Sequence, residues 1–290
     1  MSPAAKGIVL VSLGVLILSP DALLIRLIST DVWTLLFFRG LGQVTMLGSV
    51  LLVTERGGAL ARLRFLGWAG LAAGLAFSAS QMGFVVGVRL TSPANVLILV
   101  SLAPLAAALF SWLLMGERLA GATALAIFGA VAGVVITVWD STAVGSWVGD
   151  LVALTTPFTV ALAITLLRFA PRIDTRLVLM VSGCGAIAVS ASLGAPAMPS
   201  GFDFLWLPLL GLVVSPVSFL LISQGPRYLP AAEVGLLMLL ELVFGTLWVW
   251  LALSEAPTVN AFIGGGLLLA TMVAHSLWAL TRRPTPPAPE

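Results

Sequence analysis

Charge is what this chain has least of. Only 9% of its 290 residues are Asp, Glu, Lys or Arg, whereas water-soluble domains carry about 25%. Hydrophobic residues make up 60% of the chain and the mean hydropathy is +1.13. A folded protein of this size with so few charges would expose an apolar surface to water. The composition therefore indicates a protein whose surface is covered by lipid.

Histidine and cysteine are nearly absent, at one residue each. Cys184 alone excludes an internal disulfide, and with His275 it is too little for a metal cluster. The chain contains no G-x-x-x-x-G-K-[ST], G-x-S-x-G or H-E-x-x-H motif. We therefore expect no cofactor, no ATP hydrolysis and no enzymatic activity, although a carboxylate pair of Glu241 and Asp21 stays open as a catalytic arrangement. The net charge of +2, on scattered residues, predicts no nucleic-acid partner.

Long apolar segments recur along the whole chain. A helix needs about 20 apolar residues to cross a bilayer, and β-barrel strands would instead show short alternating segments. The sequence therefore predicts an all-α integral membrane protein with ten transmembrane helices. The predicted spans are 7–28, 33–54, 66–88, 92–115, 119–139, 148–168, 177–194, 204–223, 231–253 and 258–280.

Basic residues gather on one side of this predicted topology. If the N-terminus is cytoplasmic, both ends and the even-numbered connections collect most of the 14 basic residues, and only Arg26 and Arg89 fall on the opposite side. Cytoplasmic loops carry an excess of Lys and Arg, so we expect a multi-pass protein with both termini in the cytoplasm. The residues on the cytoplasmic side are Lys6, Arg56, Arg62, Arg64, Arg118, Arg168, Arg172, Arg176, Arg227, Arg282 and Arg283.

The two halves of the chain resemble each other. A shift of 138 positions aligns rare residue types without a gap, and two five-helix repeats follow, at 1–140 and 146–280. An odd number of spans in each repeat inverts the second relative to the first. Residues 281–290, with four prolines, are predicted to be a disordered cytoplasmic tail. The aligned pairs include Arg89 with Arg227, Val96 with Val234, Leu99 with Leu237, Trp112 with Trp250 and Glu117 with Glu255.

Motifs in the fourth and ninth predicted spans carry a family resemblance. In the fourth they are Thr91-Ser92-Pro93-Ala94, Pro104-Leu105 and Gly116-Glu117-Arg118-Leu119; in the ninth they are Pro230-Ala231-Ala232, Leu240-Glu241 and Ser254-Glu255. The chain resembles the EamA branch of the drug/metabolite transporter superfamily over its whole length. The resemblance implies a transporter of the bacterial inner membrane whose relatives export amino acids and other metabolites. Leu242 and Ser254 depart from the family, which commonly has proline and glycine there.

Ionisable side chains inside spans are costly in lipid, so each should face a wet cavity or a partner. Glu241 lies near the centre of its span, and we interpret it as a proton carrier, as a partner for a substrate ammonium group, or as a neutral structural carboxyl. Asp21 and Arg39 lie at similar depth in neighbouring antiparallel spans. They form either a structural ion pair or a substrate-carboxylate site at Arg39.

Polar and apolar residues at equivalent depths in the two halves are the predicted lining of a central cavity. Glu233 aligns with Asn95 in the repeat, and helix capping is its alternative role. For the small hydroxyl groups, bridging between helices is the alternative role. The predicted cavity residues are Ser78, Gln81, Asn95, Leu99, Thr156, Ser215, Ser218, Glu233, Leu237 and Glu241.

Together these features predict a secondary transporter that exports small metabolites by alternating access around a central midplane cavity. Amino acids, hydrophobic and aromatic ones included, are the expected substrates. The alternative is a multidrug exporter of lipophilic cations, with Glu241 as the counter-charge. The expected partners are a small-molecule substrate and the lipid bilayer, and a homodimer is compatible with the sequence.

Overall fold

The computed structural model describes residues 2–55, 66–116, 121–144, 146–169, 173–225, 228–229 and 231–281. Within these ranges the chain forms helices joined by turns and short irregular segments, with no strand. Ten helical segments of this part are long and apolar enough to cross a membrane. The all-helical, multi-pass fold expected from the sequence is therefore found, with span bounds within a few residues of the predicted ones.

Several spans are single helices, and three are broken. The unbroken ones are α3 (Val32–Glu55), α5 (Gly67–Leu90), α8 (Gly121–Val144), α9 (Trp147–Phe169), α10 (Thr175–Leu193), α13 (Ala231–Leu253) and α14 (Val259–Thr281). The first span consists of α1 (Pro3–Leu18) and α2 (Asp21–Leu27), and the fourth of α6 (Pro93–Val100) and α7 (Ala103–Met115). The eighth consists of α11 (Asp203–Pro208), the π-helical η1 (Leu209–Val214) and α12 (Ser215–Ile222).

Prolines lie at each of the three breaks. Pro20 separates α1 from α2, and Pro104 is the second residue of α7. Pro208 and Pro216 flank the π-helical segment. A proline has no backbone N–H to donate and its ring crowds the preceding turn, so a helix ends or is distorted before it. The breaks leave helix termini inside three of the spans. Pro157, in contrast, lies inside the continuous helix α9.

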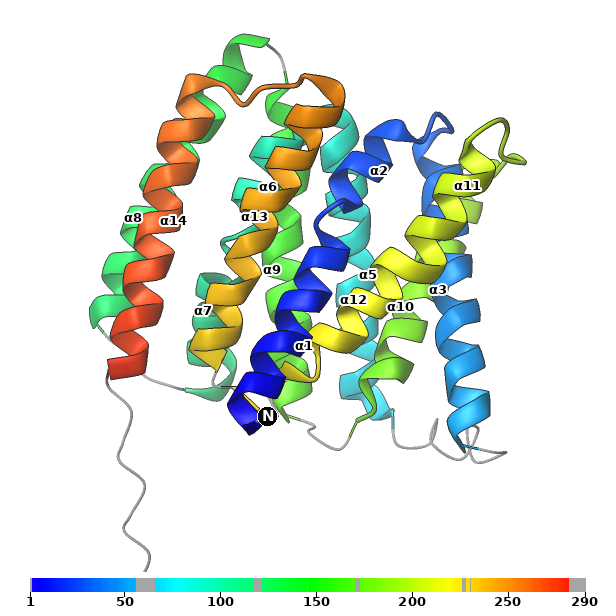
Figure 1. Cartoon of the computed structure of the whole chain (residues 1–290), viewed down its shortest axis with the longest axis horizontal. Helices are drawn as coiled ribbons and strands as arrows, with labels where there is room; N and C mark the ends of the chain where they lie inside the picture. Colours follow the sequence, from blue (N-terminus) through cyan, green and yellow to red (C-terminus); the bar gives the residue numbers. More distant parts are fainter. Residues whose placement is uncertain are drawn as a thin grey trace, which may run out of the picture.

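The helices pack in pairs along the longest axis of the molecule. The pair α8 and α14 forms one end and the pair α3 and α10 forms the other, with α6 and α13 in contact between them (Figure 1). The helix α5 packs along α9, and α1 packs along α12. The N-terminus lies at one face of this array, and α2 and α11 lie at the opposite face (Figure 1). We call the latter the distal face.

Glycines allow α3 to touch its neighbours backbone to backbone. A Cβ atom at Gly40 would lie 2.7 Å from the carbonyl oxygen of Gly183 on α10, and one at Gly42 would lie 2.7 Å from the carbonyl carbon of Gly211 in η1. Small residues permit such close approach between helices in membranes. The segment that carries Arg39 is therefore packed closely against two helices of the second half of the chain.

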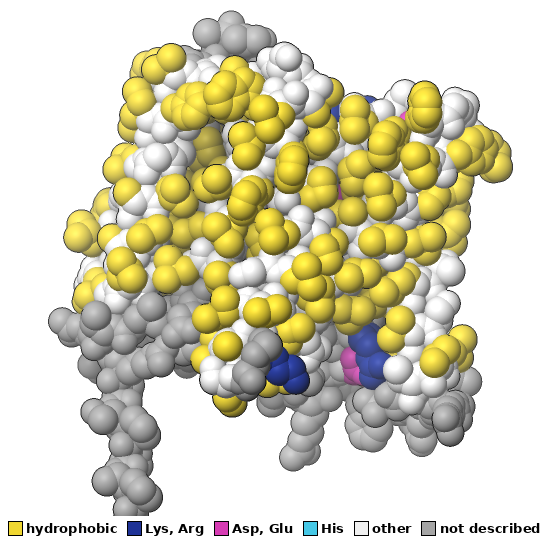
Figure 2. All heavy atoms as spheres, in the orientation of Figure 1, with side chains coloured by type: hydrophobic (Ala, Val, Ile, Leu, Met, Phe, Trp, Pro, Cys, Tyr) yellow, Lys and Arg dark blue, Asp and Glu magenta, His cyan; other side chains and the backbone are white. Residues whose placement is uncertain are grey.

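Large apolar side chains cover the outside of the molecule. Phe128 on α8 and Trp68 on α5 are each 75% exposed. On the face drawn in Figure 2, hydrophobic side chains occupy most of the height, and Lys and Arg gather toward the edge that carries the N-terminus. An apolar band of this kind is the surface that a bilayer covers.

Candidate functional site

Arg39 and Asp21 form a buried ion pair between α3 and α2. Arg39 Nη1 donates to Asp21 Oδ1 at 2.9 Å and Nη2 donates to Oδ2 at 2.8 Å. The side chains are only 3% and 5% exposed. Asp21 is the first residue of α2, directly after the break at Pro20. Two parallel charge-assisted hydrogen bonds fix both side chains, while Arg39 Nε is buried and has no hydrogen-bond partner among the described residues.

Glu241 brings a third charge to the same region. It is the eleventh of the 23 residues of α13 and is 8% exposed. Its carboxyl group interacts electrostatically with both Asp21 and Arg39. No hydrogen bond or ion pair to this carboxyl group occurs within the described part of the chain. When all three groups are ionised the region carries one uncompensated negative charge, which a proton or a cationic group of a solute can neutralise.

A buried polar cluster joins α3, α5 and α10. Gln43 Nε2 donates to the carbonyl oxygen of Leu179 at 2.6 Å. Gln81 Nε2 donates to Gln43 Oε1 at 3.0 Å and to Ser182 Oγ at 2.7 Å. Gln81 was predicted from the sequence, whereas Gln43 and Ser182 were missed. A usable signal existed for Gln43, which follows Arg39 by one helical turn and so shares its face.

The predicted hydroxyl groups lie on three helices, and all are buried. Ser78 on α5 and Ser215 on α12 have Oγ atoms without a hydrogen-bond partner among the described residues. Ser218 Oγ donates to carbonyl oxygens of its own helix. Thr156 and Ser80 contact each other across α9 and α5, with long hydroxyl-to-carbonyl distances of 3.5 and 3.4 Å. The third and eighth spans thus each contribute a buried hydroxyl group that is free to bind a further polar atom.

Asn95 belongs to another group of contacts, nearer the distal face. Its Nδ2 donates to Asp150 Oδ1 at 3.3 Å, and Thr91 Oγ1 donates to the same oxygen at 2.6 Å. Asp150 is 2% exposed and was not predicted. Glu233, which aligns with Asn95 in the repeat, has a side chain outside the described residues, so the two positions cannot be compared.

The two predicted apolar lining residues do not come together. Leu99 is 1% exposed and packs in the largest apolar cluster, with residues such as Leu97 and Val249. Leu237 is half-buried and packs against Val11 and Val15 of α1. Although Leu99 and Leu237 occupy equivalent positions in the repeat, they lie in separate apolar clusters of the structure.

Asp203 attaches the second half of the chain to the first at the distal face. Its carboxylate accepts hydrogen bonds from the Ser29 N–H at 3.0 Å, the Ser29 hydroxyl at 2.8 Å and the Thr30 N–H at 3.0 Å. Arg89 donates to the carbonyl oxygens of Ile28 and Thr30 at 2.7 and 3.1 Å. The segment between α2 and α3 is thus held by α11 on one side and by α5 on the other.

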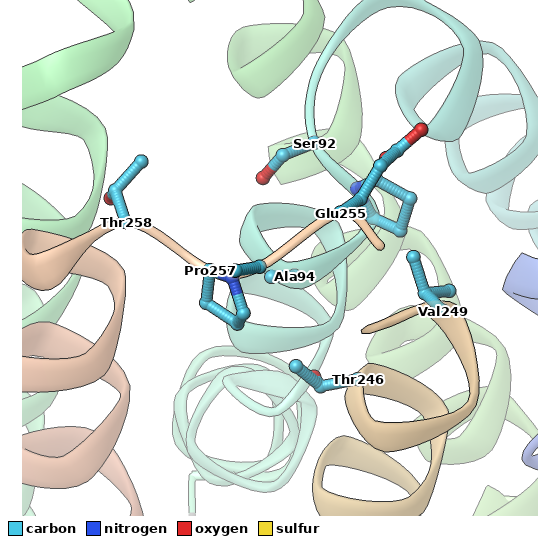
Figure 3. A pocket seen from close by; sticks show the side chains of 9 residues that line it. Ser92, Ala94, Thr246, Val249, Glu255, Pro257 and Thr258 are labelled. Atoms are coloured by element: carbon cyan, nitrogen blue, oxygen red, sulfur yellow. The ribbon is translucent and has the colours of Figure 1, made fainter. Parts of the chain in front are cut away.

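A second connection lies beside it. Arg26 donates to the carbonyl oxygen of Thr91 at 3.0 Å and pairs with Glu255 at 3.4 Å. Glu255 also borders a small hollow between the start of α6 and the end of α13, with Ser92 and Thr246 on its walls (Figure 3). Three carboxylates of the second half, Asp150, Asp203 and Glu255, therefore contact groups of the first half at the distal face. We call these three sets of contacts the distal latch.

Within the described ranges, no group of three His, Cys, Asp or Glu side chains is placed to hold a metal ion. The chemistry available is that of paired charges and neutral hydrogen-bonding groups enclosed by helices.

Comparisons with known proteins bear on the fold alone. No protein-family model and no curated protein sequence matches the chain. A solved structure, described only as a crystal structure of a protein, superposes with a TM-score of 0.68 at 22% sequence identity. The match covers 97% of this chain and 100% of the other. The likeness extends over the whole ten-span fold and carries no information on substrate.

Proposed function

We propose that this protein is a secondary transporter that exports small metabolites, amino acids among them, by alternating access. The observation that carries the proposal is the buried constellation of Asp21, Arg39 and Glu241, which brings both signs of charge into the interior of a predominantly apolar protein. Intramembrane charges are expensive and mark the pathways of ions and polar solutes.

A zwitterion fits this constellation. Glu241 can receive an ammonium group, because its carboxyl group has no hydrogen-bond partner among the described residues. Arg39 can bind a carboxylate through Nε, which is buried and unpartnered. Asp21 holds the guanidinium group in place through its other two nitrogens. Opposite charges at two points of the site are what an amino acid requires.

Lipophilic cations are the second candidate substrates. One observation favours them: Arg39 is already paired with Asp21, whereas Glu241 is not paired with any described residue. A drug cation needs only the negative charge together with apolar surroundings. Transport of a zwitterion and transport of a cation are therefore distinguished by the role of Arg39.

The alternating-access mechanism rests on an inverted repeat, and the helix contacts support one. In an inverted repeat, each of the first five spans corresponds to the span five places later. Under this exchange the contact of α5 with α9 corresponds to that of α12 with α1, and the contact of α7 with α9 corresponds to that of α13 with α1. The pairs α3 with α10, α6 with α13 and α8 with α14 are each turned into themselves. Two antiparallel copies related by a two-fold axis in the membrane plane can exchange conformations, and this exchange opens the site to each side of the membrane in turn.

The end of the fourth and ninth spans gives independent support. Gly116 after α7 has φ 68° and Ser254 after α13 has φ 58°. The backbone N–H groups of these residues donate to the carbonyl oxygens of Trp112 and Trp250, four positions earlier, at 3.0 and 2.9 Å. The same left-handed helix end thus recurs after a shift of 138 positions, even though the second position is a serine and not a glycine.

We further propose membership of the EamA branch of the drug/metabolite transporters, on the motifs of the fourth and ninth spans. The bacterial inner membrane, with both termini cytoplasmic, is the matching location. The distal latch then faces the periplasm and closes the site on that side. Export requires these contacts to break after a solute has bound from the cytoplasm.

Uptake into proteoliposomes tests the proposal. A panel of radiolabelled amino acids and a lipophilic cation such as tetraphenylphosphonium would be supplied to purified protein. Saturable flux of amino acids, competed by other members of the panel and abolished in Arg39→Gln protein that is still folded, supports the amino-acid transporter. Flux of the cation alone, retained in Arg39→Gln, supports the second candidate, and no flux of either by folded protein contradicts both.

A further inference from the structure

The amide groups of Gln43 and Gln81 are held in one orientation by a backbone carbonyl. The carbonyl oxygen of Leu179 can only accept, so Gln43 must present its NH₂ group to it. Gln43 Oε1 then faces Gln81, which must in turn present its own NH₂ group. This order fixes the amide assignments that heavy-atom positions leave ambiguous.

An unsatisfied acceptor follows from this order. With its NH₂ group committed to Gln43 and Ser182, Gln81 turns its carbonyl oxygen Oε1 away from both. Gln81 is 8% exposed, and Oε1 is buried without a hydrogen-bond partner among the described residues. Leaving a buried acceptor unpaired costs free energy, and in native proteins such groups call for an explanation.

A second unsatisfied group lies one turn away on the same helix. Ser78, three residues before Gln81, is 3% exposed, and its Oγ is likewise without a hydrogen-bond partner in the described part of the chain. It faces α10, since a Cβ atom at Gly185 would lie 2.6 Å from Ser78 Oγ. Gln81 Nε2 reaches Ser182 on the same helix. Two unsatisfied polar atoms, Ser78 Oγ and Gln81 Oε1, therefore lie one helical turn apart on α5.

We propose that Gln81 Oε1 and Ser78 Oγ form a subsite that accepts hydrogen bonds from the ammonium group of the substrate. This inference rests on the transport function proposed above and narrows it to solutes that carry N–H donors. Glu241 supplies the negative charge that any cation requires, whereas the neutral acceptors can form hydrogen bonds only with a cation that has hydrogens on its nitrogen. The subsite thereby separates amino acids and primary amines from quaternary ammonium compounds of the same charge.

A methylation series measures the discrimination. The probes are phenylalanine and its N-methyl, N,N-dimethyl and N,N,N-trimethyl derivatives, all zwitterions, of which the last has no N–H donor. The quantity is the ratio of kcat/KM for phenylalanine to that for the trimethyl derivative, in proteoliposomes. Gln81→Met keeps the length of the side chain and removes the acceptor, so steric rejection of the methyl groups stays in place.

The expected result is a fall in this ratio of about tenfold in Gln81→Met, as for loss of a hydrogen bond to a charged group. Ser78→Ala should lower the ratio less. Ser190→Ala on α10 also removes a buried hydroxyl group, one bonded only within its own helix, and should leave the ratio unchanged. A purely structural role of the cluster would lower the rates for both probes together and leave their ratio intact.

Each outcome decides between the two proposals. If the wild type transports phenylalanine and the ratio is unchanged in Gln81→Met and Ser78→Ala, the subsite is wrong and the transport function stands. If Gln81→Met does not fold, an unchanged ratio in Ser78→Ala overturns the subsite by itself. If the folded wild type transports none of the four probes, the subsite and the amino-acid function are both overturned.

Discussion

Arg39 and Asp21 meet through two parallel hydrogen bonds of 2.9 and 2.8 Å, directly after the break that separates α1 from α2. The pair is almost inaccessible, and Glu241 interacts with both of its members. The three groups are therefore not equivalent. Arg39 is the one cation of the three, and its removal leaves two carboxyl groups that interact unfavourably when both are ionised.

Substitutions in this pair should follow that asymmetry. Asp21→Asn should destabilise the protein by about 3–5 kcal/mol, as for a broken buried ion pair, with some relief because Glu241 remains as a counter-charge. Arg39→Gln should be the more damaging change. Thermal unfolding in detergent, followed by tryptophan fluorescence, measures the order. The double variant Asp21→Asn/Arg39→Gln should melt above Arg39→Gln, and equal melting of all three would contradict the account.

The distal latch should control access from the face opposite the N-terminus. Asp203→Ala removes the acceptor for three donors of Ser29 and Thr30. Loss of hydrogen bonds to a charged group should raise the population of the open form at least tenfold, since these are worth about 1.5–3 kcal/mol each. The reporter is Ile28→Cys, at a fully buried position, in a Cys184→Ala background, labelled by a membrane-impermeant maleimide.

The control for this experiment lies at the other end of the molecule. Asp174 caps α10 and pairs with Arg176 at 2.6 Å. Asp174→Asn removes a paired carboxylate, 15% exposed, without touching the latch, so it should not change the labelling rate. Equal acceleration by both variants would indicate general loosening of the fold rather than opening at the distal face.

Much of the fold could be predicted from composition and length, and less of the site. The ten spans follow from apolar segments, because lipid forces helices of a set length. The proximity of Asp21 and Arg39 could be inferred because both are ionisable, lie at similar depth and belong to antiparallel neighbours. The break between α6 and α7 was not predicted, although Pro104 was visible.

The missed residues share a physical reason. Gln43 and Ser182 are uncharged, so nothing marks them as costly in lipid, and they meet through segments far apart in the chain. Asp150 and Asp203 lie at span ends, where the sequence alone predicts an ordinary helix-capping or interfacial role for a carboxylate. Their partners belong to the other half of the chain. Sequence periodicity gives the face of a helix and not the helix that it meets.

Ser254 offers a stability test of the repeat. A side chain in the left-handed region costs about 1 kcal/mol relative to glycine, and Ser254 has φ 58°. Ser254→Gly should therefore raise the melting temperature, whereas Gly116→Ser, at the equivalent position with φ 68°, should lower it. Shifts in the same direction would mean that the two helix ends are not equivalent.

Asp31 should make the protein sensitive to acid. It lies in the connection before α3. Partial burial raises its pKa, but hydrogen bonds from the Thr34 side chain and from the backbone N–H groups of Thr34 and Trp33 outweigh this effect. The pKa of Asp31 therefore lies below its usual value of 3.8. A carboxyl group with a lowered pKa in the folded state stabilises the protein above its unfolded pKa and loses that effect as the pH falls. In Asp31→Asn the melting temperature should fall less steeply below pH 3.8 than in the wild type. Parallel curves would rule out this role.

The most direct test of the account concerns Glu241. Flux of phenylalanine into proteoliposomes would be measured with and without an imposed pH gradient, for the wild type and for Glu241→Gln, which keeps the shape of the side chain and removes its charge. The account predicts saturable flux in the wild type that a pH gradient increases, and weaker flux in Glu241→Gln that no longer responds to the gradient. Equal flux through both proteins, equally stimulated by the gradient, would contradict a role of Glu241 in the transport of protons or substrate.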